Sequence, residues 1–240
     1  MIDRHALVAR HDPVLTPGVD GALSVGNGHF AASLDRTGTQ TLPSAPGATR
    51  PTVLAEWGWH SVPAPEGPRL EDHVRRYRSP HGEVPYMDLV GPSEAGADEG
   101  PARWFRANPH KVALLALVLV DRREGRRLST EDVTPVRQHL DLWRGVVTSQ
   151  FLHRGRPCTV LTAADPEHDV LAVRVSDPQL GIELHFPYGS QEWDAAEDWT
   201  GEDRHRTRVD GAVIHRDLDD LGYMLQVTGA RPRPRGTWNG

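Results

Sequence analysis

The sequence predicts a mainly β protein made of antiparallel strands, and three observations support this prediction. Segments of about four to eight residues alternate between apolar and polar side chains, which is typical of sheets with one buried face. Short turns rich in Gly, Pro, Asp and Arg separate these segments. The chain has 240 residues, enough for one large sandwich of two packed sheets. We therefore expect a single β-sandwich domain over 1–240, incomplete at its C-terminus, with an irregular insertion over 43–109.

The first predicted element is a hairpin around Asn27 and Gly28. Two apolar-rich segments, 23–25 and 29–34, flank this pair. Asn-Gly between alternating apolar residues is the strongest short-range signal for a hairpin, because both residues tolerate a positive φ. We expect two antiparallel strands here, and the turn between them is either purely architectural or also the rim of a site.

The next regular strand is predicted at 112–120. Its nine apolar residues suit a buried strand and are too few for the roughly 20 that a membrane helix needs. From 135 to 229 strands and turns then alternate without interruption, which indicates a meander. The strands expected there are 139–143, 146–152, 158–162, 170–176, 182–188, 206–209, 212–217 and 222–229.

The insertion over 43–109 is rich in Pro and Gly and lacks alternation over most of its length. One short helix is predicted within it, at 67–79, because Leu70, Val74 and Tyr77 form an apolar stripe with helical spacing. Acidic residues near the start of this segment and arginines near its end complement a helix dipole. Several Trp and Phe residues in the insertion argue against disorder.

Composition narrows the classes of function. The formal charge of −6 is spread along the chain, so no basic stripe of the kind that binds nucleic acid is visible. Cys158 is the only cysteine, which excludes an internal disulfide, and we expect it to be a small apolar side chain in a strand. The histidines show no metal-ligand spacing, so neither a metal nor a cofactor is predicted. Since no signal peptide or membrane helix is visible, we expect a cytoplasmic protein without nucleic-acid or membrane partners.

The segment "EWGWHS" (56–61) is the first candidate site. On an extended segment, Trp57 and Trp59 would point to the same face. Paired indoles form a flat apolar platform with a polar N–H edge, which suits stacking against a sugar ring. His60 beside them would donate a hydrogen bond to a hydroxyl. The alternative is that both indoles are core packing between the sheet and the insertion.

The second candidate is the acidic loop 190–203, which contains Glu192, Asp198 and further carboxylates together with two Trp. Glycoside hydrolysis needs two carboxylates flanking a sugar, and such a loop would be able to supply them. A solvated acidic surface is the alternative. Upstream, "RANPHK" (106–111) places Arg106 and His110 near the start of the 112–120 strand, where a structural role is favoured over a ligand-binding one.

Five segments in order carry a resemblance to a known family. They are "LSVGNGHFAASLDRTGTQTL", "EWGWHS", "RANPHKVALLALVLV", "QHLDLWRGVVTSQF" and "LHFPY". In this order they resemble the N-terminal part of six-hairpin glycosidase-like proteins, within the (α/α)6 class of glycoside hydrolases and phosphorylases. The family's S-[VL]-G-N-G turn is matched by Ser24–Gly28, and its LDL-x-x-G strand by Leu140–Gly145.

The resemblance implies an antiparallel β-super-sandwich of the galactose-mutarotase-like kind, followed by a helical barrel that holds the catalytic acid. Twelve barrel helices of about 12 residues each, with connections, need roughly 200 residues. The predicted strands and the insertion already occupy nearly all of this chain, so no catalytic residue is carried over. Asn27, Trp57, Trp59 and His60 would line a carbohydrate surface near the barrel.

Three functional hypotheses follow. The first is a non-catalytic, carbohydrate-related sandwich domain, or truncated form, that docks against a helical barrel. The second is a stand-alone glycosidase or mutarotase-like enzyme that uses loop carboxylates such as Glu192 with His60 or His185. The third is a structural or partner-binding sandwich without sugar affinity, which full burial of Trp57 and Trp59 would favour.

Overall fold

The computed structural model describes residues 2–19, 21–42, 51–64, 69, 71, 74–87, 101–192, 195–229 and 234–235. Over these residues the chain is mainly β, with predominantly antiparallel sheets, as the alternation predicts. The two α-helices described are short.

A five-stranded antiparallel sheet forms one layer, in which the last four strands form a meander. Its strands are β1 (Val14–Leu15), β11 (Val133–Asp141), β12 (Val146–His153), β13 (Arg156–Ala164) and β14 (Leu171–Val175), in the spatial order β1-β11-β12-β13-β14. In β12, Val147, Ser149, Phe151 and His153 are buried and the residues between them are less so. Successive side chains of a strand point to opposite faces, so this pattern gives the sheet one buried face. The meander predicted from 135 to 229 is confirmed over 133–175, whereas the later strands of that range belong to other sheets.

A four-stranded sheet packs against the buried face of the meander. Its strands are β9 (Ala116–Asp121), β10 (Arg126–Arg127), β15 (Leu180–His185) and β19 (Pro234–Arg235), in the order β10-β9-β15-β19. The apolar cluster between the two sheets includes Leu119, Phe151, Cys158 and Leu180. Cys158 is therefore a buried free thiol in the core, as predicted. Two sheets sharing an apolar cluster make a sandwich-like arrangement.

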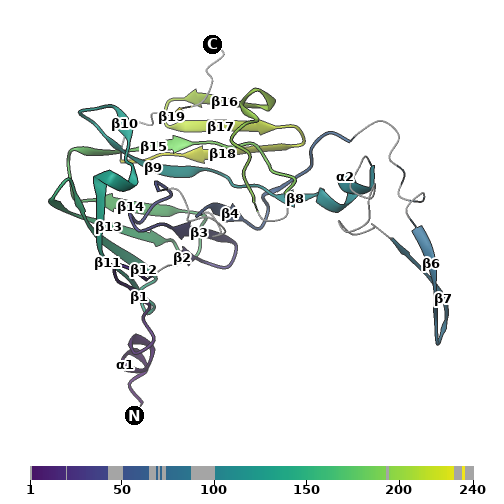
Figure 1. The fold of residues 1–240 in the computed structure, drawn as a ribbon, viewed down its shortest axis with the longest axis horizontal. Helices are drawn as coiled ribbons and strands as arrows, with labels where there is room; N and C mark the ends of the chain where they lie inside the picture. The colour runs from purple at the N-terminus through teal and green to yellow at the C-terminus, as the bar shows by residue number, and fades with distance from the viewer. Residues whose placement is uncertain are drawn as a thin grey trace.

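Two three-stranded sheets enclose a larger apolar cluster. They consist of β2 (Leu23–Gly26), β3 (Phe30–Leu34) and β4 (Val53–Ala55), and of β16 (His205–Asp210), β17 (Val213–Leu218) and β18 (Leu221–Gln226). The cluster includes Leu34, Val53, Phe186 and Ile214. Figure 1 shows β9, β15 and β16–β18 stacked over β2–β4 and β11–β14.

The predicted first hairpin is confirmed as β2 and β3. Asn27 Oδ1 accepts hydrogen bonds from the backbone N–H groups of His29 (3.0 Å) and Phe30 (2.9 Å). A Cβ atom added to Gly26 would lie 2.5 Å from the Phe30 carbonyl oxygen, and Gly28 has a φ of +96°. The turn therefore needs glycine at both positions, once for close approach and once for left-handed backbone.

The strand predicted at 112–120 is shorter in the structure. Only Ala116–Asp121 forms β9, although Val112, Ala113 and Leu114 are buried. The backbone N–H groups of these three residues donate to Gly58, Ala196 and Val53, respectively. Because these acceptors lie on three separate segments, no single neighbouring strand pairs with 112–114.

The helix predicted at 67–79 is wrong over its described second half. Val74–Ser79 forms strand β6, which pairs with β7 (Gly82–Met87). Tyr77 contacts Tyr86 across the pair, with ring centroids 6.2 Å apart. Aromatic and β-branched residues favour strands, and this cross-strand pairing outweighs the helix-like charge order. Leu70 and Asp72, which the prediction also used, lie outside the described residues.

The short helix of the insertion lies further along the chain, at α2 (Pro101–Ala107). Its first residue is proline, which is favoured at the first position of a helix. The other described helix, α1 (Arg4–Ala9), begins after Asp3, whose side chain accepts a hydrogen bond from the Ala6 N–H. Two 3-10 turns, η2 (Thr130–Asp132) and η3 (Glu202–Arg204), complete the helical elements described.

Candidate functional site

A shallow hollow of about 380 Å³ lies beside the Asn27 turn. The end of β2, the start of β3, the end of β4 and Lys111 surround it. Its polar and charged side chains are those of Ser24, His29, Glu56 and Lys111. The sequence indicated this turn as a possible rim of a site, and in the structure the segment 54–56, which directly precedes Trp57, also lines the hollow.

Asn27 builds the rim. Its Nδ2 donates to the backbone carbonyls of Asp165 (3.2 Å) and His168 (3.0 Å), which ties loop 165–169 to the turn. Its Oδ1 accepts the two turn N–H groups described above. An amide has two N–H donors and one carbonyl, so Asn27 has both donors engaged within the protein and acts by positioning the rim.

Trp57 and Trp59 lie at the surface near this rim. Their side chains are 43% and 50% exposed, respectively. The Trp57 Nε1–H donates to Asp169 Oδ2 (2.9 Å), and its ring contacts Tyr223 at a centroid separation of 5.7 Å. This exposure is the opposite of the full burial that core packing of both indoles requires.

The segment that carries the two indoles is not continuously extended. Glu56 and Trp57 form a turn, in which the Gly58 N–H donates to Ala55 and the Trp59 N–H donates to Trp57. Strand β5 (Trp59–His60) begins only after this turn. The expectation that both indoles share one face through strand alternation is therefore not met, because alternation applies only within a continuous strand.

Lys111 connects the second indole to the hollow. Strand β8 (His110–Lys111) pairs with β5, so that Trp59 is opposite Lys111 and His60 is opposite His110. The Lys111 ammonium lies 4.2 Å from the centre of the Trp59 ring and donates to the Ala55 and Glu56 carbonyls. Such a cation–π contact orders both side chains. Lys111 is the only lysine of the chain, but nothing in the sequence around it indicates this contact with Trp59.

His29 and Glu56 form an exposed ion pair at the hollow. The distance from His29 Nδ1 to Glu56 Oε2 is 2.8 Å, and both side chains are more than half exposed. The hydrogen bond and the charge of Glu56 raise the pKa of His29 above its ordinary value. Glu56 is the one carboxylate among the described residues that line the hollow.

His60 does not reach the hollow, because its side chain is completely buried. Its Nδ1 lies 3.0 Å from His110 Nε2, and its Nε2 lies 3.0 Å from Asp219 Oδ2. The Tyr188 hydroxyl donates to the same Asp219 oxygen. Asp219 is 159 positions away from His60 in the sequence, and no local signal could have linked them. Contact between His60 and a ligand at the surface is therefore not supported by its position.

The described residues of the acidic loop do not line the hollow. Glu192 pairs with Arg103 (2.9 Å), and Asp198 pairs with Arg204. Trp193 and Asp194 lie outside the described residues. His185, the other histidine of the enzyme hypothesis, lies 3.4 Å from Glu183. Glycoside hydrolysis needs two carboxylates on opposite sides of the substrate, and the described lining of the hollow offers only Glu56.

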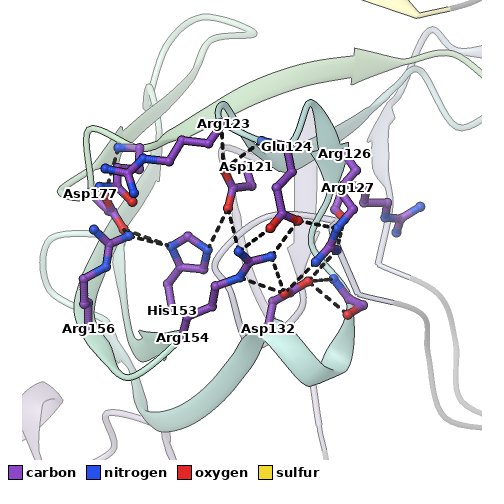
Figure 2. A network of polar contacts seen from close by, with 12 residues as sticks. Asp121, Arg123, Glu124, Arg126, Arg127, Asp132, His153, Arg154, Arg156 and Asp177 are labelled. Atoms are coloured by element: carbon purple, nitrogen blue, oxygen red, sulfur yellow. Dashed lines mark hydrogen bonds and ion pairs between the residues drawn. The ribbon is translucent and has the colours of Figure 1, made fainter.

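A dense polar network lies elsewhere, around Arg154 (Figure 2). Arg154 contacts Glu124 and Asp132, and Arg126 reaches Asp132 through both terminal nitrogens, at 2.7 and 2.9 Å. Next to them, the buried His153 ring lies between Asp177 (3.0 Å) and Asp121 (3.6 Å). These charges neutralise one another, which is typical of a structural network.

The pKa values in this network reflect the ion pairs. Hydrogen bonds from Arg154 lower the pKa of Glu124 to about 2. The bonds from Arg126 hold the pKa of Asp132 well below its ordinary range. Both carboxylates therefore remain charged at neutral pH. Asp132 ties the η2 turn to Arg154, the residue directly after strand β12, and Glu124 ties the turn between β9 and β10 to the same arginine.

In comparisons with known proteins, no family model and no curated protein match this chain. Over the described residues, no group of His, Cys, Asp and Glu has the arrangement of a metal site. The same part of the chain contains no helix that is long and apolar enough to cross a membrane.

Proposed function

We propose that this chain is a non-catalytic carbohydrate-binding sandwich domain whose ligand surface is formed by Trp57, Trp59 and the hollow beside them. The observation that carries the proposal is the half-exposed state of both indoles next to a hollow lined by His29, Glu56 and Lys111. Aromatic rings supply apolar contact to a sugar face, and neighbouring polar groups supply hydrogen bonds to its hydroxyls. The ordered resemblance to six-hairpin glycosidase-like proteins supports the same ligand class.

The proposal assigns bond cleavage to a separate helical domain. Within the described lining of the hollow, Glu56 has no second carboxylate opposite it, which counts against the stand-alone enzyme hypothesis. The exposure of both indoles counts against a purely structural sandwich. We therefore expect weak sugar binding, with a Kd of about 1 mM, and no turnover of glycosides by this chain.

The single lysine of the chain gives a direct test of the binding surface. Amine acylation followed by mass spectrometry reports Lys111 alone among the side chains. A panel of neutral gluco-, galacto-, manno- and xylo-configured oligosaccharides is tested for protection of Lys111, with the N-terminal amine as the internal reference. We expect one configuration to protect Lys111 and to give a binding isotherm in titration calorimetry.

Variants locate the binding. Trp59→Ala should weaken affinity by about tenfold, which is about 1.4 kcal/mol of binding free energy, and Trp57→Ala should weaken it as well. Trp143→Ala is the matched control, because Trp143 is also half exposed (53%) but contacts His5 instead of the hollow. Equal affinity of all three variants, or the absence of protection by every sugar, would contradict the proposal.

A further inference from the structure

The ribbon formed by β5 and β8 has two functionally different faces. Trp59 and Lys111 pair on one face, where the lysine also lines the hollow. His60 and His110 pair at the next position, which points to the opposite face because strands have a period of two. Each strand has only two residues, so side-chain contacts must contribute much of what orients the ribbon.

The histidine face is packed without spare room. The rings of His60 and His110 lie 5.0 Å apart between centroids, and Tyr188 contacts His60 at 5.1 Å. A Cβ atom added to Gly189 would lie 2.3 Å from His60 Nδ1 and 2.6 Å from His110 Nε2. The two rings are therefore held against the backbone at Gly189, and any shift of the His60 ring would displace the ribbon.

The proton on His110 is fixed by its acceptor. His110 Nδ1 lies 2.9 Å from the Ala107 carbonyl oxygen, which can only accept, so Nδ1 carries a proton and donates. Burial and the neighbouring His60 hold the pKa of His110 below its ordinary value, and a neutral ring has only one N–H. His110 Nε2 is therefore a bare acceptor, and the bond to it must be donated by His60 Nδ1.

The other end of the chain of hydrogen bonds is fixed by Tyr188. Burial and the bond to Asp219 raise the pKa of Tyr188 above its ordinary value, so the phenol keeps its proton and donates to Asp219. The same carboxylate oxygen lies 3.0 Å from His60 Nε2. If His60 were neutral with its proton on Nδ1, the lone pair of its completely buried ring would face the Asp219 carboxylate at hydrogen-bond distance, and two acceptors would oppose each other.

We propose that His60 is an imidazolium that donates from both ring nitrogens, to His110 and to Asp219, and is thereby a positioning residue for the Trp59–Lys111 pair. The charge-assisted bond to Asp219 is of the stronger class of hydrogen bond. It connects the ribbon to the turn between β17 and β18, where Asp219 has a φ of +42°. The nature of the ligand at Trp59 rests on the function proposed above, but the protonation of His60 does not.

Other charged groups border the cluster formed by His60, His110 and Asp219, but they do not supply the second ring proton of His60. Asp220 accepts from the Ser61 N–H (3.2 Å), and Arg204 lies 4.0 Å from the centre of the Tyr188 ring, on the side of η3. Burial beside Arg216 lowers the pKa of His205, which stacks on Tyr188, to about 4, so His205 is neutral. Asp198 bonds to the Tyr188 backbone, and it is already paired with Arg204.

Asp219→Asn tests the proposal because its amide can donate to a neutral His60 and needs no extra proton. Lys111 acylation is measured for both proteins between about pH 6.5 and 9.5, and the rates are expressed as a ratio of wild type to variant, which cancels the intrinsic pH dependence of the amine. We expect this ratio to rise by about threefold or more with pH, because the hydrogen-bond chain from His110 to Asp219 needs one proton more in wild type than in the variant, and the wild-type ribbon loosens when that proton is removed. A ratio that stays constant would overturn the proposal.

Two control variants separate protonation from simple loss of contacts. Asp220→Asn makes the same change of charge at the next residue, and Tyr188→Phe removes a hydrogen bond from the same carboxylate. Both retain the need for a protonated His60, so both should keep the pH dependence of the wild type. If either one abolishes it as Asp219→Asn does, the effect is one of charge or packing and the proposal fails.

Nitrogen-15 spectra of the wild-type histidine side chains give an answer that does not depend on any variant's folding. We expect one buried imidazole with protons on both nitrogens at about pH 7, whereas a bare Nε2 on His60 would overturn the proposal. Sugar titrations at both ends of the pH range separate this inference from the proposed function. Sugar binding with a constant acylation ratio refutes only the inference, and a rising ratio without any sugar binding refutes only the proposed function.

Discussion

The Arg154 network and the Trp59–Lys111 surface are both clusters of charged groups held by short β elements, but they differ in where those groups find partners. In the network, the guanidinium groups of Arg126 and Arg154 meet the carboxylates of Glu124 and Asp132. At the surface, Lys111 is held by backbone carbonyls and an aromatic face. In the Arg154 network the charged groups pair with one another. At the Trp59–Lys111 surface about half of each indole remains exposed to water.

This difference separates groups that stabilise the fold from groups available to a ligand. Removing one partner of a closed ion-pair network leaves the others unpaired, which is costly when they are partly buried. Removing a half-exposed indole leaves a surface that water already covered in part. Mutations in the Arg154 network should therefore mainly lower the stability of the fold. Mutations of the two indoles should mainly weaken ligand binding.

The largest effect on stability is expected for Asp132→Ala. Asp132 is buried and accepts hydrogen bonds from Arg126, Arg154 and Ser129. Its removal should lower the free energy of unfolding by about 3 kcal/mol, measured by urea denaturation. The control is Glu131→Ala at the neighbouring exposed position, which should change it by less than about 0.5 kcal/mol. Equal effects of the two substitutions would show that the network is not stabilising.

Lowering the pH should gradually remove the stabilisation that the Arg154 network provides. Because the pKa values of Asp132 and Glu124 are lower in the folded protein than in the unfolded chain, the stabilisation is fully present above the ordinary carboxyl pKa of about 4. It is lost as the pH falls through the folded pKa, which for Glu124 is about 2. The difference in stability between wild type and Asp132→Ala should therefore narrow from about pH 5 downwards. A difference that is independent of pH in unfolding titrations would contradict this origin.

The sequence alone predicts those elements whose structure depends on residues close together in the chain. The Asn27 turn follows from local backbone preferences, and the strands of the meander follow from alternation within each segment. The helix predicted at 67–79 failed because Val74–Ser79 pairs with Gly82–Met87, and cross-strand contacts override a helix-like order of charges. Trp57 and Trp59 were singled out as a candidate site, but the sequence left open whether they lie at the surface or in the core, and it did not predict the turn at Glu56 that separates them.

The rest of the site could not be predicted because it depends on long-range contacts. His60 and Asp219 are 159 positions apart, and Asn27 and the carbonyl of His168 are 141 apart. Arg154 meets Glu124 from 30 positions away, through a turn in which Arg154 has a φ of +51°. Residue type alone suggested that His60 would face a ligand, whereas its position opposite His110 in β5 and β8 turns it inward.

A smaller effect on stability is expected at the tryptophan surface. Trp59→Ala removes a ring that is half exposed and the cation–π contact with Lys111. We expect the free energy of unfolding to fall by about 1 kcal/mol or less, while acylation of Lys111 becomes faster because its ammonium loses one contact. Trp59→Phe retains an aromatic face and should restore most of the slow acylation. A loss as large as that of Asp132→Ala would assign Trp59 to the core.

The smallest effect is expected for Glu56→Gln, which tests the charge at the edge of the hollow. Glu56 raises the pKa of His29. The stabilisation by this ion pair is therefore fully present below the unfolded histidine pKa of about 6.5, and it is lost as the pH rises through the pKa of His29 in the folded protein. Because both side chains are largely exposed, the variant should show no measurable change in the free energy of unfolding. It should instead lower the pKa of His29 towards its ordinary value in an NMR titration, and added salt should shift wild type in the same direction. An unchanged His29 pKa would mean that the two side chains do not pair in solution, and Glu56 would then be an unpaired carboxylate at the edge of the hollow.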